Sequence, residues 1–302
     1  MTVSVLVPSS LTREAEDKRE ATRKLGDVAR AATIYRVDRV IVFPDPEGET
    51  VRDGGFVSTV LRYAATPPYL RKEVWGRRDE LEYAGVLPPL RATSRTGSGS
   101  NGSGSLRQGI VTQVGPEGRV RVNCGLQHPI ALPVPAEMSV GEGERVTVRI
   151  TSRRPVRAKL VDESPPGFAV ERTDLDAALA RPDAGVRIAT SRHGEPLTLG
   201  RLEALGPAID DDGLTVAFGA PERGLPEILG IDPETVASGA PTDGQGDRAS
   251  AMEGDRARDD EDRVTCDPGF EHWLDTVPNQ GSEVVRTEEA LFATLACLAL
   301  RA

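Results

Sequence analysis

The stretch VSVLVPSSLTREAEDKREATRKLGDVARAATIYRVDRVIVF (residues 3–43) decides the fold of this chain. It opens with the apolar run VSVLVP (3–8) and closes with RVIVF (39–43), and both runs are typical of buried β-strands. Between them, apolar residues spaced by four, three and four positions predict a helix over residues 12–33. A strand, a helix and a second strand within about 45 residues form a βαβ pattern, which predicts a parallel sheet.

The same alternation returns in the last third of the chain. VRIAT (186–190), LTVAFG (214–219) and HWLDTV (272–277) are predicted strands, each followed by a polar or Gly- and Pro-rich segment. Helices are expected over residues 55–65, before two prolines, and over residues 285–300. The fold class is therefore α/β, with a parallel sheet assembled from both ends of the chain.

A different pattern separates these two α/β parts. Five short β-rich runs predict a small five-stranded barrel of the OB type. They are QGIVTQV (108–114), RVRVN (119–123), PIALPV (129–134), RVTVRI (145–150) and VRAKLV (156–161). The low-complexity segment SRTGSGSNGSGS (94–105) predicts a flexible linker. The expected organisation is an α/β part over 1–92, a linker over 93–106, an inserted barrel over 107–164, and the second α/β part over 165–302.

Charge is distributed unevenly along the chain. The net charge is −10, yet residues 91–160 carry 11 basic and 4 acidic side chains. A basic segment inside an acidic protein favours a polyanion such as RNA as partner, although a structural insert without a ligand is the alternative. Residues 232–263 carry 10 acidic and 4 basic side chains and almost no large apolar residue, so a disordered acidic loop is expected there.

The basic residues are almost all arginine, 33 of 37, and acidic residues exceed them. This composition resembles that of proteins adapted to molar salt, where screening leaves only close arginine contacts effective. A GC-rich genome is the alternative explanation for arginine over lysine, but it does not explain the acidic excess.

The spacing of the cysteine and histidine residues and the length of the apolar runs argue against metal-binding, disulfide-rich and membrane-spanning proteins. Cys124, Cys266 and Cys297 share no CxxC spacing and the three histidines are dispersed, so no structural metal site or disulfide framework is expected. No run reaches the length of a membrane span, and the N-terminus is a predicted strand rather than a signal peptide. A reducing cytoplasmic setting without a membrane follows.

Three loops follow three of the predicted strands. They are TSRHGEP (190–196), GAPERGLPE (219–227) and TVPNQGSEVVRTEE (276–289). Because parallel sheets bind ligands at the carboxyl ends of their strands, these loops predict one shared small-molecule site. Such loops can hold an adenosine by main-chain hydrogen bonds. Ordinary tight turns are the alternative for each loop taken singly.

The sequence at this site resembles a known family. GAPERGLPEIL (219–229) and LDTVPNQGSEVVRTEEALFATLACLAL (274–300) resemble the SPOUT superfamily of trefoil-knotted RNA methyltransferases. More narrowly, they look like its archaeal and eukaryotic branch, which has an OB-like domain inserted into the knotted domain. Further matches to that branch are VPSSL (7–11), ARAATIYRVDRVIVF (29–43), TPPYLRK (66–72) and GVLPPLRAT (85–93).

The resemblance implies a knotted α/β domain whose C-terminal segment threads a loop. It also implies S-adenosylmethionine as cofactor, a homodimer, and an RNA site shared between subunits. The residues it implies for cofactor binding are Thr190, Ser191, Gly194, Gly219, Glu222, Gly224, Thr276, Val277, Pro278, Asn279, Gln280 and Gly281.

The chemistry of methyl transfer suggests further candidates. The sulfonium is an activated methyl donor, so no metal is required. A pyrimidine nitrogen or a hydroxyl group must lose a proton, which a carboxylate can accept while an arginine stabilises the anion. The catalytic candidates are Arg286, Glu283 and Arg223, with helix capping as the alternative for Arg286 and Glu283. The RNA-binding candidates are Arg19, Arg23, Arg145, Arg149, Arg153, Arg154 and Arg157.

The leading hypothesis is thus a methyltransferase acting on structured RNA such as ribosomal RNA, with a uridine as target by resemblance. The second is a non-catalytic RNA-binding or ribosome-assembly factor on the same fold. The glycines and proline at the three loops favour the first, because they allow close approach of a ligand. A protein-binding role for the barrel is a third, weaker hypothesis, since an arginine-rich surface with few aromatic residues does not favour it.

Overall fold

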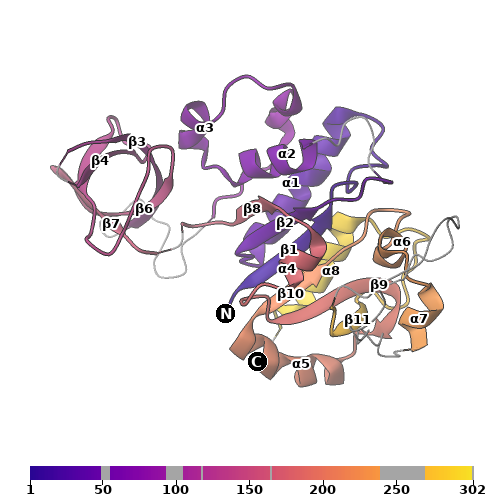
Figure 1. Ribbon diagram of the computed structural model, residues 1–302. Helices are drawn as coiled ribbons and strands as arrows, with labels where there is room; N and C mark the ends of the chain where they lie inside the picture. The colour runs from indigo at the N-terminus through magenta and orange to yellow at the C-terminus, as the bar shows by residue number, and fades with distance from the viewer. Residues whose placement is uncertain (49–54, 93–104, 117, 164, 239–268, 301–302) are drawn as a thin grey trace, which may run out of the picture. The chain divides into compact units, whose positions relative to one another are not determined.

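The computed structural model describes residues 1–48, 55–92, 105–116, 118–163, 165–238 and 269–300 (Figure 1). The chain forms two compact units, one of Met1–Glu16, Arg39–Val57 and Glu171–Ala302, the other of Asp17–Asp38 and Ser58–Val170. Most of the predicted linker, 93–104, and most of the predicted acidic loop, 239–263, lie outside the described residues.

The first unit is built on a parallel sheet. Its strand order is β11-β9-β10-β1-β2-β8. The strands are β1 (Val3–Pro8), β2 (Arg39–Phe43), β8 (Ala169–Arg172), β9 (Val186–Pro196), β10 (Leu214–Ala217) and β11 (His272–Asp275). Pairing is parallel from β11 through β9, β10 and β1 to β2, which confirms the α/β fold class and the parallel sheet predicted from the sequence.

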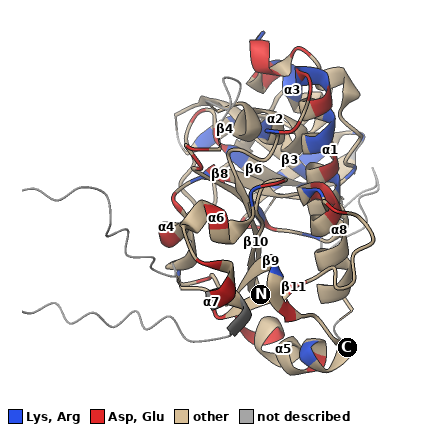
Figure 2. Ribbon diagram, turned by 90° about the vertical axis from the view of Figure 1, so that its right-hand side faces the viewer, with Lys and Arg blue, Asp and Glu red and all other residues tan. Residues whose placement is uncertain are grey.

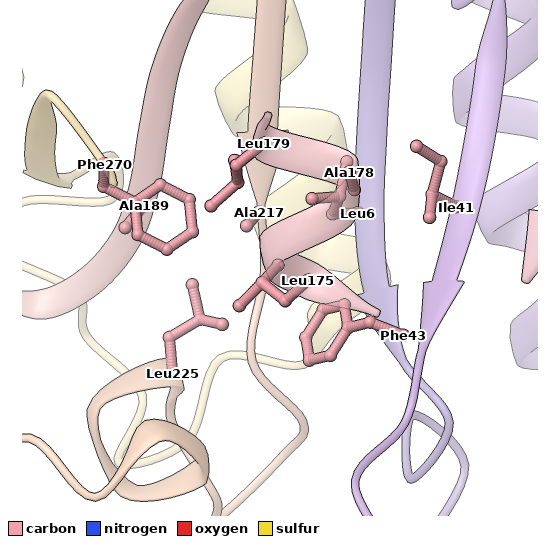
Figure 3. Close-up of a cluster of buried hydrophobic side chains, with 10 residues drawn as sticks. All are labelled: Leu6, Ile41, Phe43, Leu175, Ala178, Leu179, Ala189, Ala217, Leu225 and Phe270. Carbon is pink, nitrogen blue, oxygen red and sulfur yellow. The ribbon is translucent and has the colours of Figure 1, made fainter. Parts of the chain in front are cut away.

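Helices from the second half of the chain complete this unit. They are α4 (Leu175–Leu179), α5 (Leu199–Asp212), α6 (Leu225–Leu229), α7 (Pro233–Ser238) and α8 (Thr287–Leu298). Figure 3 shows α4 in front of the strands and the yellow α8 behind them. Leu175 and Leu179 of α4 pack with Leu6 of β1, Ile41 of β2 and Ala217 of β10 in one buried cluster. The sheet is apolar on both faces, as the continuous apolar strands require.

The second unit contains helices and an antiparallel sheet. The helices are α1 (Lys18–Ile34), α2 (Phe56–Ala65), whose first two residues belong to the first unit, α3 (Pro68–Val74) and the 3₁₀ turns η1 (Asp79–Leu81) and η2 (Ala84–Val86). The sheet has the order β5-β4-β3-β6-β7. Its strands are β3 (Ser105–Val114), β4 (Arg119–Asn123), β5 (Ile130–Pro133), β6 (Arg145–Arg153) and β7 (Val156–Val161). It curls into the nearly closed barrel visible as a ring in Figure 1, and all five strands lie where the sequence predicted them.

The barrel encloses its own small core. Val146, Val148 and Ile150 alternate along β6 and belong to a cluster with residues of the other strands, as expected for strands with one buried face. Gly109 of β3 allows the strands to close, because a Cβ there would lie 2.5 Å from Val122 Cγ1. The boundaries of the insertion at 107 and 164 stay a prediction.

Helix α1 starts later than predicted, at Lys18 instead of residue 12. Residues 8–15 form consecutive turns, in which the N–H groups of Leu11 and Arg13 donate to the carbonyl oxygens three positions earlier. Asp17 then caps the helix, since its carboxylate accepts the N–H of Glu20 at 2.7 Å. The helix therefore begins directly after Asp17, the residue whose side chain caps it.

Other boundaries also need correction. Strand β9 continues to Pro196, so the segment 190–196 predicted as a loop lies within a strand. Residues 105–106 of the predicted linker belong to β3, and residues 233–238 of the predicted disordered loop form α7. Helix α5 has no predicted counterpart: its apolar residues are interrupted by Pro207, which hides its periodicity.

Two negative findings concern the described residues alone. None of their helices is long and apolar enough to cross a membrane. Within the same residues, no group of His, Cys, Asp or Glu side chains is placed to hold a metal ion.

The core of the first unit makes a stability prediction. Leu6→Ala should lower the free energy of unfolding by about 3 kcal/mol, because the fully buried side chain leaves a cavity between β1 and α4. The matched control is Leu199→Ala, whose side chain is 77 % exposed and should change stability by less than about 0.5 kcal/mol. Chemical denaturation followed by circular dichroism measures both; equal losses would contradict the assigned core.

Candidate functional site

Strand β9 opens into a wide bulge at the carboxyl end of the sheet. Trp273 of β11 pairs with Ala189, but the next residue, Leu274, pairs with Glu195, so residues 190–194 leave the ladder. Gly194 closes the bulge, because a Cβ there would lie 2.7 Å from the main chain of Trp273 and Leu274. The bulge directs a short polar segment away from the ladder, as bulges beside ligand sites often do.

A second segment follows β10. The N–H groups of Ala220 and Arg223 donate to each other's carbonyl oxygens, and Glu222 between them has a left-handed φ of 59°. Gly219 precedes this tight turn, and a Cβ there would lie 2.7 Å from the backbone nitrogen of Leu225. Only glycine fits at position 219 without moving the turn.

A third segment follows β11 and leads into α8. The Asp275 carboxylate accepts the N–H of Val277 at 3.1 Å, which shapes its beginning. Two hydroxyl groups of α8 attach that helix to the two later segments. Thr294 donates to the hydroxyl of Thr276 at 2.6 Å, and Thr287 donates to the carbonyl oxygen of Gly219 at 2.8 Å.

Together the three segments line one cavity of about 320 Å³ in the first unit. Cavities of this size are typical of small-molecule sites. Among its lining residues are the predicted cofactor residues Thr190, Ser191, Gly219, Glu222, Gly224, Thr276, Val277 and Gln280. Outside the lining are Gly194, Pro278, Asn279 and Gly281. The structure thus brings all three predicted loops together, while some of their residues shape the turns instead.

Arg223 is a buried arginine with three carboxylate partners, of which Asp45 is also buried. Its Nε lies 3.2 Å from both carboxylate oxygens of Asp45, its Nη2 3.0 Å from Glu47 and its Nη1 3.0 Å from Glu227. Burial opposes its charge, but the Asp45 carboxylate and the hydrogen bonds to these acids outweigh that cost and raise the pKa of Arg223. All three guanidinium nitrogens have carboxylate partners, and these contacts hold the turn after β10 in position. A catalytic role for Arg223 stays a prediction.

Asp45 is the central carboxylate of this network. It was not among the predicted site residues. It is 2 % exposed, accepts the hydroxyl of Ser10, and donates its N–H to the Ser9 hydroxyl at 2.9 Å. The sequence did contain an indication of its position. PDPEG (44–48) directly follows the strand RVIVF, so it lies at the carboxyl end of the sheet, where ligand sites are expected. Arg192, His193 and Phe218 also line the cavity and were not singled out.

The other two catalytic candidates differ in position. Glu283 lines the cavity, is exposed, and has no hydrogen-bonded or ionic partner for its carboxylate among the described residues. Arg286 lies outside the lining at the start of α8, where its N–H donates to Glu289 and its Nε lies 3.6 Å from Glu14. These contacts place Arg286 at the helix start, as the capping alternative expects, and its catalytic role stays a prediction.

The predicted RNA-binding arginines fall into two groups, all in the second unit. Arg19 and Arg23 on α1 and Arg154 and Arg157 near the β6–β7 turn are exposed, and Arg153 ends β6. The other two are engaged within the unit. Arg145 donates to the Thr66 hydroxyl, and burial, with nearby Arg62, lowers its pKa, while Arg149 pairs with Glu163.

The network around Arg223 yields a prediction. Asp45→Asn should lower the free energy of unfolding by about 3 kcal/mol, because it leaves a buried guanidinium short of its central carboxylate. Glu227→Gln removes a carboxylate that is 58 % exposed from the same guanidinium and should cost less than about 1 kcal/mol. Urea denaturation compares the two; a loss for Asp45→Asn no larger than for Glu227→Gln would contradict the positioning role.

Similar proteins are known from archaea and animals. A protein of Haloarcula marismortui is 65 % identical over 301 residues, and one of Halobacterium salinarum is 65 % identical over 300; each alignment covers 99 % of both chains, and both relatives are named only as uncharacterised proteins. The mouse protein named 28S rRNA (uridine-N(3))-methyltransferase is 28 % identical over 323 residues, covering 98 % of this chain and 76 % of the relative.

A family model agrees with the animal relatives. The model described as "Putative RNA methyltransferase" matches residues 2–298, which include the parallel sheet, the barrel and all three segments of the cavity. The chain therefore belongs to this family of RNA methyltransferases.

Proposed function

We propose that the chain transfers a methyl group from S-adenosylmethionine to ribosomal RNA, with N3 of a uridine as the acceptor atom. The observation that carries the proposal is the convergence on one cavity of the β9 bulge and the two segments that follow β10 and β11. The acceptor atom follows the mouse relative, which is named 28S rRNA (uridine-N(3))-methyltransferase.

The residues of the cavity suit this cofactor. Val277 and Val284 supply apolar surface for a base, and the loops around Gly219 and Gly224 bring main-chain groups to the cavity wall. Glu222 is an exposed carboxylate on the lining, which can accept hydrogen bonds from ribose hydroxyls or neutralise the cationic end of the molecule. The chemistry of the lining is therefore compatible with a cationic nucleoside.

The protein must orient the uridine and remove a proton. S-adenosylmethionine held among the three segments would supply an activated methyl group for transfer to N3, and would leave as the neutral thioether. N3 of uridine carries a proton, so we assign its removal to Glu283. Arg192 is an exposed cation on the lining and can stabilise the negative charge on the uracil oxygens.

The finer features of the family resemblance are part of the same proposal. A knotted path is supported by β11 lying beside β9 although β10 intervenes in sequence, and by the hydrogen bonds from α8 to both later loops. The five-stranded barrel suits an OB-like role in RNA binding. A homodimer, a cytoplasmic location and function in high salt complete the proposal.

Cofactor binding is tested by calorimetric titration with S-adenosylmethionine in high-salt buffer. We expect saturable binding near one site per chain. Gly219→Ala should weaken it roughly tenfold, about 1.4 kcal/mol, because the added methyl group displaces the turn at Gly224 and Leu225. Gly200→Ala is the control, since a Cβ there meets nothing within 4 Å. Absence of binding by the folded chain would favour the non-catalytic RNA-binding factor.

The proton acceptor is tested by Glu283→Gln. This change should lower kcat about 100-fold while changing cofactor affinity little, because the amide cannot accept the N3 proton. Glu222→Gln, the matched variant on the same lining, should affect cofactor affinity more than kcat. Methylation of RNA followed by digestion and mass spectrometry of 3-methyluridine measures both. An unchanged kcat for Glu283→Gln would exclude Glu283 as the base.

A further inference from the structure

A second basic segment lies outside the barrel. Residues 62–78, RYAATPPYLRKEVWGRR, contain five basic side chains and one acidic side chain in a chain whose net charge is −10. The same segment holds Tyr63, Tyr69 and Trp75, although the chain has only four tyrosines and two tryptophans. Aromatic and basic residues are therefore concentrated together at the end of α2, along α3 and just beyond it.

The rings in this segment are held in fixed positions. The Trp75 indole donates to the Thr66 hydroxyl at 3.0 Å, and its ring meets Tyr63 edge to face with centroids 5.9 Å apart. The Arg71 guanidinium lies 4.5 Å from the centroid of Tyr63 and donates to the carbonyl oxygens of Thr66 and Ala64. The arrangement is thus built before any ligand arrives, which lowers the entropic cost of binding.

Tyr63 and Trp75, but not Tyr69, line an open hollow of about 950 Å³ that lies wholly in the second unit. Lys72, Arg77 and Arg78 line the same hollow and are exposed. None of the three forms an ion pair with any carboxylate in the part of the chain that the structure describes, and Arg78 lies 5.4 Å from the centroid of Trp75. Glu82, an acidic residue that also lines the hollow, forms an ion pair with Lys18 at 3.3 Å. Figure 2 shows the charged residues along α1 and α3 of this unit.

We propose that this basic–aromatic hollow binds a single-stranded segment of the RNA substrate. Exposed cations match phosphate groups, and aromatic rings with stacked guanidinium groups match the faces of unpaired bases. An acidic protein segment would match the cations but would leave the rings unused, so RNA fits the whole set of residues better. The inference rests on the proposed function and adds Lys72, Arg77 and Arg78 to the RNA-binding candidates of the barrel. Arg145 of the barrel donates to the same Thr66 hydroxyl that accepts the Trp75 indole, so the two surfaces adjoin.

The first test measures binding of the full chain to a fluorescein-labelled single-stranded oligouridylate of about a dozen nucleotides by fluorescence anisotropy. Replacing Lys72, Arg77 and Arg78 together by Gln should weaken binding about tenfold or more. The slope of log affinity against log salt should fall by about 2, since each phosphate contact in a single strand contributes about 0.7. Arg172→Gln removes an exposed cation on β8, outside the hollow, and should change neither quantity appreciably.

The second test uses Trp75 as a reporter. In a Trp273→Phe background Trp75 is the only tryptophan, so its fluorescence reports on the hollow alone. Oligouridylate should quench this fluorescence by stacking, whereas inorganic polyphosphate, which offers charge without bases, should not. Quenching by both ligands or by neither would overturn the stacking arrangement.

The outcomes separate this inference from the proposed function. A chain that binds neither S-adenosylmethionine nor oligouridylate would contradict the proposed function itself. A chain that binds both, and whose triple Gln variant binds oligouridylate as tightly as the unmodified chain, would contradict only the hollow. That result would leave an acidic protein segment as the partner of this surface.

Discussion

The parallel pairing of β9 with both β10 and β11 is the constraint on which the site depends. β11 follows β10 in the chain but pairs with the opposite edge of β9. The connection from β10 to β11 must therefore pass over β9 before β11 can pair. That crossing places the loop after β10 and the loop after β11 on either side of the β9 bulge. Helix α8 then returns to both loops, and its hydroxyl groups hold them at the cavity.

The backbone around the cavity is held by close contacts of a few residues. Gly194 and Gly219 allow backbone contacts that no other residue would permit, which fixes the bulge and the turn. The Arg223–Asp45 pair joins the turn after β10 to the segment after β2, and serines at the end of β1 complete it. Three adjacent strands therefore contribute to one wall. Such a preorganised wall is what methyl transfer requires, since the reaction depends chiefly on alignment of donor and acceptor.

The sequence predicted the parallel sheet and the five barrel strands because their apolar periodicity is local and strong, as in RVIVF and RVTVRI. It also predicted that the segments 190–196, 219–227 and 276–289 would meet, although the first of them lies within β9 and not after it. It did not predict the Asp45 network, which joins residues 178 positions apart, because such a pairing depends on the folded topology and not on spacing. The continuation of β9 through a bulge and the capped start of α1 were missed for a related reason. Register and capping are decided by partners elsewhere in the chain.

The hydroxyl contacts of Thr190, Thr287 and Thr294 have a consequence for the solvent in which this protein works. Each is a neutral hydrogen bond, to Ala217, Gly219 and Thr276 respectively, and neutral bonds lose nothing to counterions. The Arg223–Asp45 pair is shielded from counterions by burial. Surface pairs such as Arg201–Glu195 lack that protection. As ionic strength rises, the surface therefore loses its electrostatic contacts first, while the walls of the cavity keep their shape.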